Sequence, residues 1–149
     1  MTRKTPPSRP ASAPRLTPAD YELLAQFRYA LRKFIAFSEA EAAAIGLAPQ
    51  QHQALLAIKG TPDRDGLYIG EIADRLLIKP HTAAELVDRL VRMDLAQRLP
   101  DPADGRRVQV VLTEHAEQLL EDLSVAHLQE LHSIRPLLTR LLGRFDKVA

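Results

Sequence analysis

Two absences narrow the classes to which this sequence can belong. The 149-residue chain contains no cysteine, which excludes disulfides, thiolate metal sites and thiol-based catalysis or redox switching. No apolar run approaches the roughly 20 residues that a membrane-spanning helix needs. No apolar stretch follows the basic residues near the amino end either, so a secretory signal is not expected. The sequence therefore indicates a cytoplasmic protein that has no membrane partner.

An excess of charge of one sign is also lacking. Lysine and arginine total 20 and aspartate and glutamate total 19, a formal net charge of +1, so bulk electrostatics does not favour a polyanionic partner. The charge is unevenly distributed, with +5 over residues 1–33 and −4 over the remainder. Residues 1–17 combine basic side chains with four prolines, which predicts a disordered, basic, proline-rich tail.

Histidine and the carboxylates are the only material for catalysis. The five histidines form no His-Glu-x-x-His motif, and the sequence has no glycine-rich phosphate loop. We therefore expect no enzyme activity and no cofactor. A regulatory metal bound by His115, Glu117, His127 and His132 stays open as an alternative, but their spacing matches no usual ligand pattern, so no metal residue is assigned.

Apolar residues at three- and four-residue spacing predict a mainly helical chain. Thr17 is expected to cap a first helix, and Gly46 to end it in the left-handed conformation. A second helix is expected between Pro49 and Gly60, followed by a turn over residues 61–66. Two short helices joined by about four residues, 77–80, then have the spacing of a helix-turn-helix.

After the second of these short helices, the spacing of apolar residues changes from helical to alternating. Residues 108–112 alternate in the manner of a strand and follow a turn at 101–105, which predicts a two-stranded hairpin. Thr113 is expected to cap a long helix, and Pro136 to break it so that a separate final helix follows. The predicted fold class is mainly α with a small β-hairpin wing, a winged helix-turn-helix domain plus a helical dimerisation region.

Short stretches of this sequence resemble the MarR family of transcriptional regulators in their order and spacing. They are Leu47–Gln51 (LAPQQ), Ile69–Leu76 (IGEIADRL), Leu86–Leu90 (LVDRL), Asp101–Arg107 (DPADGRR) and Leu112-Thr113. The resemblance covers about residues 18–146. It implies a homodimer, formed by the first and last helices, that binds a pseudo-palindromic operator in double-stranded DNA and is expected to repress transcription.

The resemblance divides the chain into four segments. They are the tail 1–17, an N-terminal dimerisation helix 18–46, a winged helix-turn-helix DNA-binding region 47–112 and C-terminal dimerisation helices 113–149. It also leaves room for a small-molecule effector between the dimerisation and DNA-binding parts that changes operator affinity. A pocket for that effector is expected beside Phe27, Phe34 or Phe37.

The second short helix of the helix-turn-helix is the expected recognition helix. If its apolar positions face the core, helical geometry turns His81, Thr82, Ala84 and Glu85 outward, toward the major groove. Thr82 can bond to a base or meet a thymine methyl, and Glu85 can accept from cytosine N4. Ala84 replaces a common hydroxyl residue of the family, and Glu85 a common basic one. Lys79 is expected to meet phosphate.

The hairpin tip supplies the other expected DNA contacts. In the family an Arg at the position of Arg106 enters the minor groove, where negative potential is concentrated. Gly105 is expected to allow a tight turn, Arg98 and Asp104 to brace the hairpin as an ion pair, and Arg107 to contact phosphate. An alternative function is that of a winged-helix dimer that binds protein instead of DNA. The cationic tip of the hairpin argues against this alternative.

Overall fold

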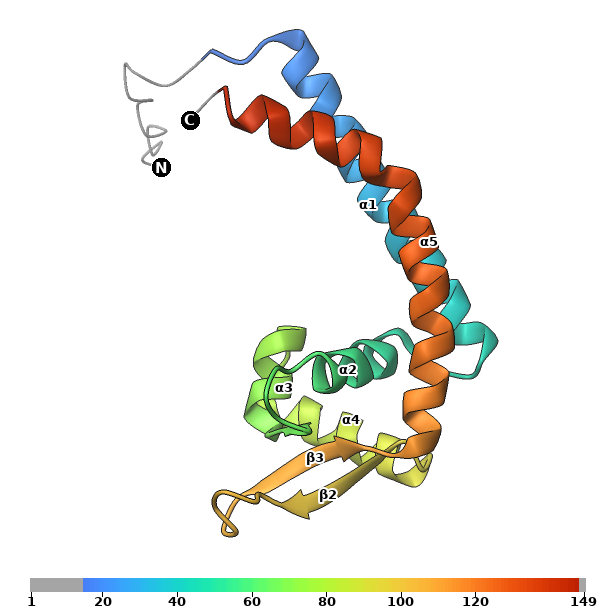
Figure 1. Cartoon of the computed structure of the whole chain (residues 1–149), viewed down its shortest axis with the longest axis vertical. Coiled ribbons are helices and arrows are strands. Elements are labelled where there is room, and N and C mark those ends of the chain that lie inside the picture. Colours follow the sequence, from blue (N-terminus) through green and yellow to red (C-terminus); the bar gives the residue numbers. More distant parts are fainter. Residues whose placement is uncertain (1–14, 148–149) are drawn as a thin grey trace, which may run out of the picture. The chain divides into compact units, whose positions relative to one another are not determined.

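The computed structural model of the chain describes residues 15–147 (Figure 1), so the prediction for tail residues 1–14 lies outside the described part. Two compact units are formed, one by the residues up to Lys33 and from Ser133 onward, the other by Phe34–His132. The helices and strands are α1 (Pro18–Ala44), α2 (Pro49–Lys59), β1 (Gly66–Leu67), α3 (Ile69–Leu76), α4 (Pro80–Arg92), β2 (Ala96–Pro100), β3 (Val108–Leu112) and α5 (Glu114–Phe145).

The predicted ends of α1 are confirmed. The Thr17 hydroxyl accepts from the Asp20 N–H at 3.3 Å, and the Asp20 carboxylate accepts from the Thr17 N–H at 2.7 Å. This reciprocal pair satisfies donors that the first turn of a helix leaves free. Gly46 has a φ of 81°, the left-handed region in which glycine carries no steric penalty.

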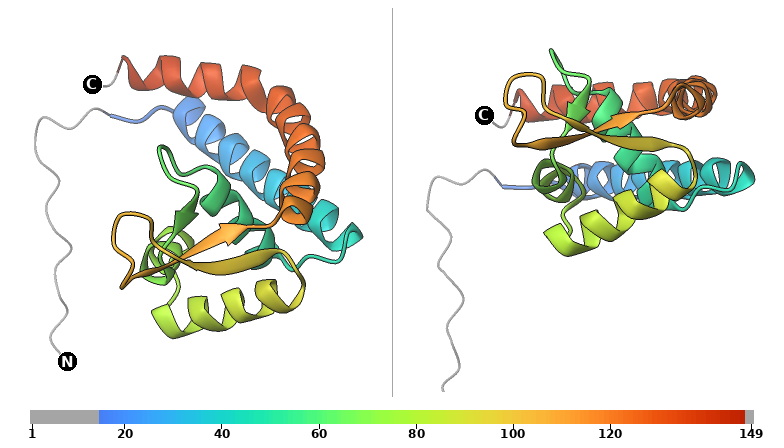
Figure 2. Two further views of the ribbon diagram at one scale, coloured as in Figure 1. Left: turned by 60° about the horizontal axis from the view of Figure 1, so that its bottom comes forward. Right: turned by 90° about the horizontal axis from the view of Figure 1, so that it is seen from below.

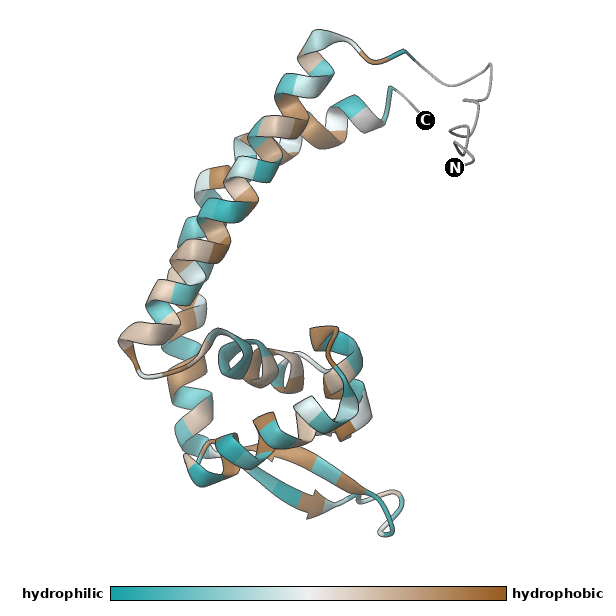
Figure 3. Ribbon diagram, turned by 180° about the vertical axis from the view of Figure 1, so that it is seen from behind, coloured by the Kyte–Doolittle hydropathy of each residue, from teal (hydrophilic) through white to brown (hydrophobic). Residues whose placement is uncertain are grey.

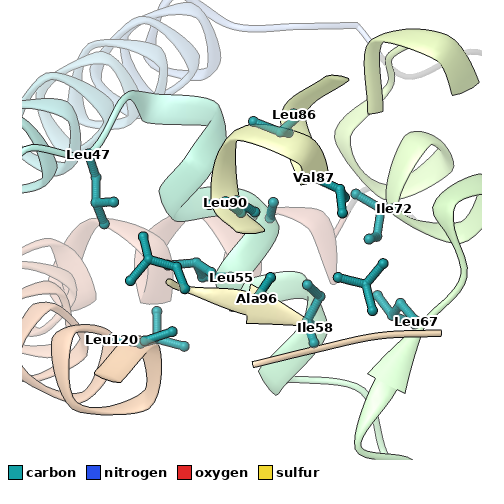
Figure 4. Packing of buried hydrophobic residues seen from close by; sticks show 14 of the residues in the cluster. Leu47, Leu55, Ile58, Leu67, Ile72, Leu86, Val87, Leu90, Ala96 and Leu120 are labelled. Carbon is teal, nitrogen blue, oxygen red and sulfur yellow. The ribbon is translucent and has the colours of Figure 1, made fainter. Parts of the chain in front are cut away.

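The core of the Phe34–His132 unit lies where α2, α3, α4 and β1 meet (Figure 4). Ile58 of α2 is buried near Leu67 of β1 and Ile72 of α3, and Leu55 of α2 is buried beside Leu120 of α5. The four apolar positions predicted for the inner face of α4 are buried as expected: Ala83, Leu86, Val87 and Leu90. Each large side chain removed from water contributes about 1.5–3 kcal/mol, so this core fixes the outward face of α4.

The sheet has three strands rather than the two expected, in the order β1-β3-β2. Gly66, expected to lie in a turn, pairs with Val111 in an antiparallel ladder. A Cβ atom at Gly66 would lie 2.6 Å from the carbonyl oxygen of Val110, a distance that only glycine avoids. A two-residue strand is too short to show an alternating pattern, so periodicity could not predict it.

Two expected boundaries were wrong. Pro80 is the first residue of α4 rather than part of the turn, so the turn comprises only residues 77–79; proline suits this position because a first-turn N–H has no helical partner. Pro136 lies inside α5, which runs as one helix to Phe145, so no separate final helix exists. Beyond Pro136, the buried Leu141 and the ion pair of Arg144 with Asp20 hold the segment, offsetting the lost hydrogen bond.

Candidate nucleic-acid interface

The exposed face of α4 carries the residues predicted to read bases. His81 and Glu85 are exposed, and Thr82 and Ala84 are partly exposed. Lys79 is the exposed N-cap residue, and its carbonyl accepts from the Ala83 N–H at 3.0 Å. The start of α4 therefore presents one cation and three polar side chains to solvent, beside the small Ala84.

Arg98 does not pair with Asp104, which corrects the predicted brace of the hairpin. Its guanidinium donates to the carboxylate of Asp88, which lies one turn beyond Glu85 on the outer face of α4. The ion pair therefore joins β2 to α4 and neutralises one of the two acids on that face. Because both side chains are exposed, the ion pair contributes little to stability. Its main effect is to reduce the negative charge on the outer face of α4.

Asp101 organises the loop between β2 and β3. It is only 7% exposed. Its carboxylate accepts from the N–H groups of Ala103 and Asp104, at 2.7 and 3.3 Å, and from the hydroxyl of Tyr68. The Tyr68 hydroxyl, and next the Ala103 N–H, lower the pKa of Asp101 below its ordinary value because both donate to the ionised form. The carboxylate thus fixes the loop from within.

Arg106 belongs to this loop, which extends past the ends of β2 and β3 (Figure 2). Its side chain is 92% exposed, with Nε 3.2 Å from the Asp104 carboxylate, which also accepts the Arg106 N–H at 3.1 Å. Gly105 has no positive φ, and a Cβ atom there would contact nothing within 4 Å. The expected need for glycine at this turn is therefore wrong, because Asp101 and Asp104 shape the loop instead.

Arg107 lies against an aromatic ring. Its guanidinium carbon is 3.6 Å from the ring centroid of Tyr68, and that of Arg64 is 5.4 Å from the same centroid. The hydrogen bond to Asp101 raises the pKa of Tyr68, which keeps the hydroxyl protonated as a donor. Sequence reasoning missed both Tyr68 and Asp101, although Asp101 belongs to the turn that the sequence singled out.

Tyr68 is held in place by the start of α3. Glu71 accepts from the Tyr68 N–H at 2.8 Å and from the Arg64 guanidinium at 2.7 Å. Burial raises the pKa of Glu71, but the donation from Arg64 and from the Tyr68 N–H outweighs it and lowers the pKa overall. An acid three residues into a helix is one half of a capping box, and this spacing is the signal that could have identified Tyr68.

The metal-binding alternative gains no support from residues 15–147. Within that range no three His, Asp or Glu side chains come together in a way that could hold an ion. Glu117 instead pairs with Lys59 at 2.7 Å, and the His127 ring lies 2.7 Å from the Ser38 hydroxyl. None of the helices in this range is apolar over a length that would cross a membrane.

Comparison with known proteins finds relatives of the winged-helix region. The model of the MarR family matches residues 45–107, which run from the end of α1 to the wing loop. Over these residues the chain is similar to the MarR family. A relative in Bacillus subtilis (strain 168), the uncharacterized HTH-type transcriptional regulator YsmB, is 30% identical over 57 residues, which are 38% of this chain and 39% of YsmB.

Solved structures of MarR proteins share the fold over most of the chain. A protein of this family from Bacillus stearothermophilus has a TM-score of 0.67 at 22% identity, covering 87% of this chain and 94% of its own. A variant of S. aureus MepR bound to an oligodeoxyribonucleotide has a TM-score of 0.63 at 22% identity, covering 88% and 99%. At these identities the likeness shows the MarR winged-helix fold.

Proposed function

We propose that the chain is a transcriptional regulator that binds double-stranded DNA as a homodimer, recognises a pseudo-palindromic operator and represses the promoter it covers. The observation that carries this proposal is the placement of Arg106. Its 92% exposed cation projects from the wing of the same unit that exposes the start of α4. A winged helix that served only to bind protein would have no use for a cation at that tip.

The start of α4 enters the major groove in this proposal. His81, Thr82 and Glu85 then face base edges, with Glu85 accepting from a cytosine amino group. Lys79, at the N-cap, contacts phosphate, which supplies affinity without sequence information. Because Arg98 neutralises Asp88, the helix approaches the duplex with one unpaired acid on this face, Glu85.

The wing enters the adjacent minor groove. Arg106 inserts at its tip, where a narrow groove concentrates negative potential. Arg107, stacked on Tyr68, reaches phosphate from the side of the wing. The oligonucleotide bound to the MepR variant supports DNA as the partner class.

The homodimer is supported by exposed apolar residues of the outer helices, along which apolar positions recur in the hydropathy colouring of Figure 3. Several lie in the unit that joins the amino end of α1 to the carboxyl end of α5, and each is at least 38% exposed: Leu16, Tyr21, Leu24, Tyr29, Leu31 and Leu142. Exposed apolar surface of this extent marks a contact with another molecule. A second copy of the chain covers it in our proposal, with segments 18–46 and 113–149 forming the interface.

Regulation by a small molecule completes the proposal. An effector bound near α1 and α2 releases the operator by favouring a dimer whose recognition helices no longer match the half-site spacing. Such a regulator acts in the cytoplasm, where promoter DNA is available.

The test is fluorescence anisotropy of the purified protein on duplex DNA from upstream of its own gene, with random duplex as competitor, at two salt concentrations. A specific regulator binds the upstream duplex at nanomolar concentrations, resists competition and loses affinity steeply as salt rises. Sedimentation at the same concentrations checks for the dimer. Binding to both duplexes with equal affinity would refute the operator, and a monomer bound tightly to DNA would refute the homodimer.

A further inference from the structure

A groove of about 580 Å³ opens where the carboxyl end of α5 lies beside the amino end of α1 (Figure 1). Both segments belong to the unit formed by the residues up to Lys33 and from Ser133 onward. None of the exposed apolar side chains assigned above to the homodimer lines this groove, so it is distinct from that apolar surface. The lining residues are Thr17, Ala19, Asp20, Leu23, Arg140, Gly143, Arg144 and Lys147.

Three of the lining residues are cations from the last turns of α5. Arg140, Arg144 and Lys147 are four and three positions apart, a spacing that places them on one face of the helix. Together they extend over about 10 Å of the helix axis. Gly143 lies on the same wall, and a Cβ atom there would contact nothing within 4 Å. The space between the cations is therefore open.

Of these three cations, only Arg144 has an acidic partner within residues 15–147. The Asp20 carboxylate accepts from its guanidinium, from the Thr17 N–H at 2.7 Å and from the Thr17 hydroxyl at 2.9 Å. Asp20 is 6% exposed, so its charge is already used within the wall. Arg140 has one long contact, 3.4 Å to the side-chain oxygen of Gln26, and forms no ion pair in that range, and neither does Lys147.

The surrounding unit does not offset the charge of these two unpaired cations. Its described residues, 15–33 and 133–147, include eight lysines and arginines against three acids, a net charge of +5. Residues 34–132 include nine against sixteen, a net charge of −7. The carboxyl end of a helix carries about half a negative charge, which is less than either cation. The near-zero charge of the chain therefore conceals a positive unit, which attracts anions to the groove.

The chemistry of the cations selects among anions. A guanidinium presents paired N–H groups that match two phosphate oxygens, and an ammonium adds a compact charge. A monovalent carboxylate would leave one of the two unpaired cations without a counter-charge, whereas a diphosphate carries enough charge for both. Surfaces that bind nucleic acid follow the backbone over several nucleotides, so three cations within about 10 Å of helix suit one small compound better.

We propose that this groove binds a small phosphorylated compound that has two adjacent phosphoryl groups, held by Arg140, Arg144 and Lys147. Arg144 keeps its hydrogen bonds to Asp20 and donates its remaining N–H groups to the ligand. Arg140 and Lys147 gain the counter-charge that they lack in the free protein. Binding requires neither DNA nor the winged helix, so the proposal goes beyond the proposed function and does not depend on it.

The test uses inorganic pyrophosphate, titrated by isothermal calorimetry into the full chain without DNA. The titration is run at pH 7.5 and at low, constant ionic strength, where charges are least screened. We expect a dissociation constant below about 1 mM, and binding of acetate, which has one charge, at least about tenfold weaker. No binding of pyrophosphate, or equal affinity for the two anions, would overturn the proposal.

Three variants locate the ligand. Arg140→Gln and Lys147→Gln each remove one unpaired cation and leave the ion pair of Arg144 with Asp20 in place, and each should weaken pyrophosphate binding about fivefold or more. Arg135→Gln removes a cation from an exposed position of α5 outside the lining and should change affinity less than about twofold. Circular dichroism checks that each variant is folded. Equal losses in all three, or no loss in the folded groove variants, would refute the site.

Random duplex DNA tests the other source of phosphoryl groups. By anisotropy, the double variant Arg140→Gln with Lys147→Gln should bind this duplex as the wild type does. A duplex affinity that falls as far as the pyrophosphate affinity would mean that the cations contact a nucleic-acid backbone, and would overturn the proposal. Failure of the protein to bind its upstream duplex would instead refute the proposed function, and pyrophosphate binding would persist.

Discussion

Arg107 stacks on the ring of Tyr68, with its guanidinium carbon 3.6 Å from the ring centroid. The two residues are far apart in the sequence: Tyr68 precedes α3, and Arg107 precedes β3. The Tyr68 hydroxyl also donates to Asp101, which anchors the wing loop. One side chain outside the wing thus touches both ends of its loop, and the position of the tip depends on it.

Tyr68→Phe tests this dependence. The substitution keeps the ring under Arg107 and deletes only the donor to Asp101, so the loop should loosen while the domain stays folded. We expect a lower unfolding free energy, because the Asp101 carboxylate loses a donor, and about fivefold weaker operator binding, measured by urea denaturation and anisotropy. Operator affinity equal to that of the wild type would contradict the role given to Tyr68.

Arg106→Ala tests the wing tip itself. Loss of the cation from the minor groove should weaken operator binding by about tenfold or more and leave the dimer intact, as measured by anisotropy and sedimentation. Arg135→Ala removes the same charge from an exposed position of α5 and should change affinity little. If the two variants bind alike at moderate salt, Arg106 has no special role.

Leu77 lies in the turn between α3 and α4 with a φ of 56° and a side chain that is 92% exposed. A left-handed backbone costs a non-glycine residue about 1 kcal/mol, and asparagine less. Leu77→Asn should therefore raise the unfolding free energy by about 0.5 kcal/mol. Leu77→Val, whose branched Cβ crowds this conformation further, should lower it by about 1 kcal/mol. Urea denaturation would contradict the argument if the two substitutions had the same sign.

Asp20 makes the stability of the outer helices depend on pH. Hydrogen bonds from the Arg144 guanidinium, and next from the Thr17 N–H, hold its pKa well below the usual value of 3.8. The folded state therefore binds this proton less readily than the unfolded chain, and the contribution is present above pH 3.8 and lost as the pH falls below it. Thermal melts should show Asp20→Asn less stable than wild type at pH 7, with the gap narrowing below pH 4. A gap that does not change with pH would refute the assignment.

Like Asp20, His52 should make the protein less stable as the pH falls, although protonation charges the histidine ring and neutralises the aspartate. Because burial, and next the neighbouring His127, lower its pKa from the ordinary 6.5, the unfolded chain binds the proton more readily, and stability falls as the pH drops below 6.5. Proton NMR of the ring should give a pKa below 6.5, and His52→Phe should remove part of the stability loss between pH 7 and 5. A measured pKa above 6.5 would contradict this argument.

Periodicity was enough to predict the helices of the winged domain, because each buries one face. The buried positions of α4 followed from a spacing of three and four, and with them the outward side of His81 and Glu85. The caps at Thr17 and Thr113 followed from side chains that bond within three residues. Such interactions join residues only three or four positions apart, so a single sequence is enough to predict them.

Partners distant in the sequence could not be predicted in this way. From the sequence, Arg98 could pair with Asp88 or with Asp104. It pairs with Asp88 because β2 packs beside α4. The contacts of Tyr68 with Asp101 and Arg107 span more than thirty residues. Phe34 does line a cavity together with His127, and Phe37 packs against the His127 ring, whereas Phe27 belongs to the other unit.

The sequence by itself determined the winged-helix pattern, the absence of thiol chemistry and the cationic tip of the wing, because these depend on composition and on neighbours along the chain. The tertiary structure decided which acid Arg98 neutralises, which ring supports Arg107 and that the cations at the end of α5 line a groove beside the start of α1. The reason is physical: burial and pairing depend on distances between segments, and those distances are set by how the helices and the sheet pack around a shared core.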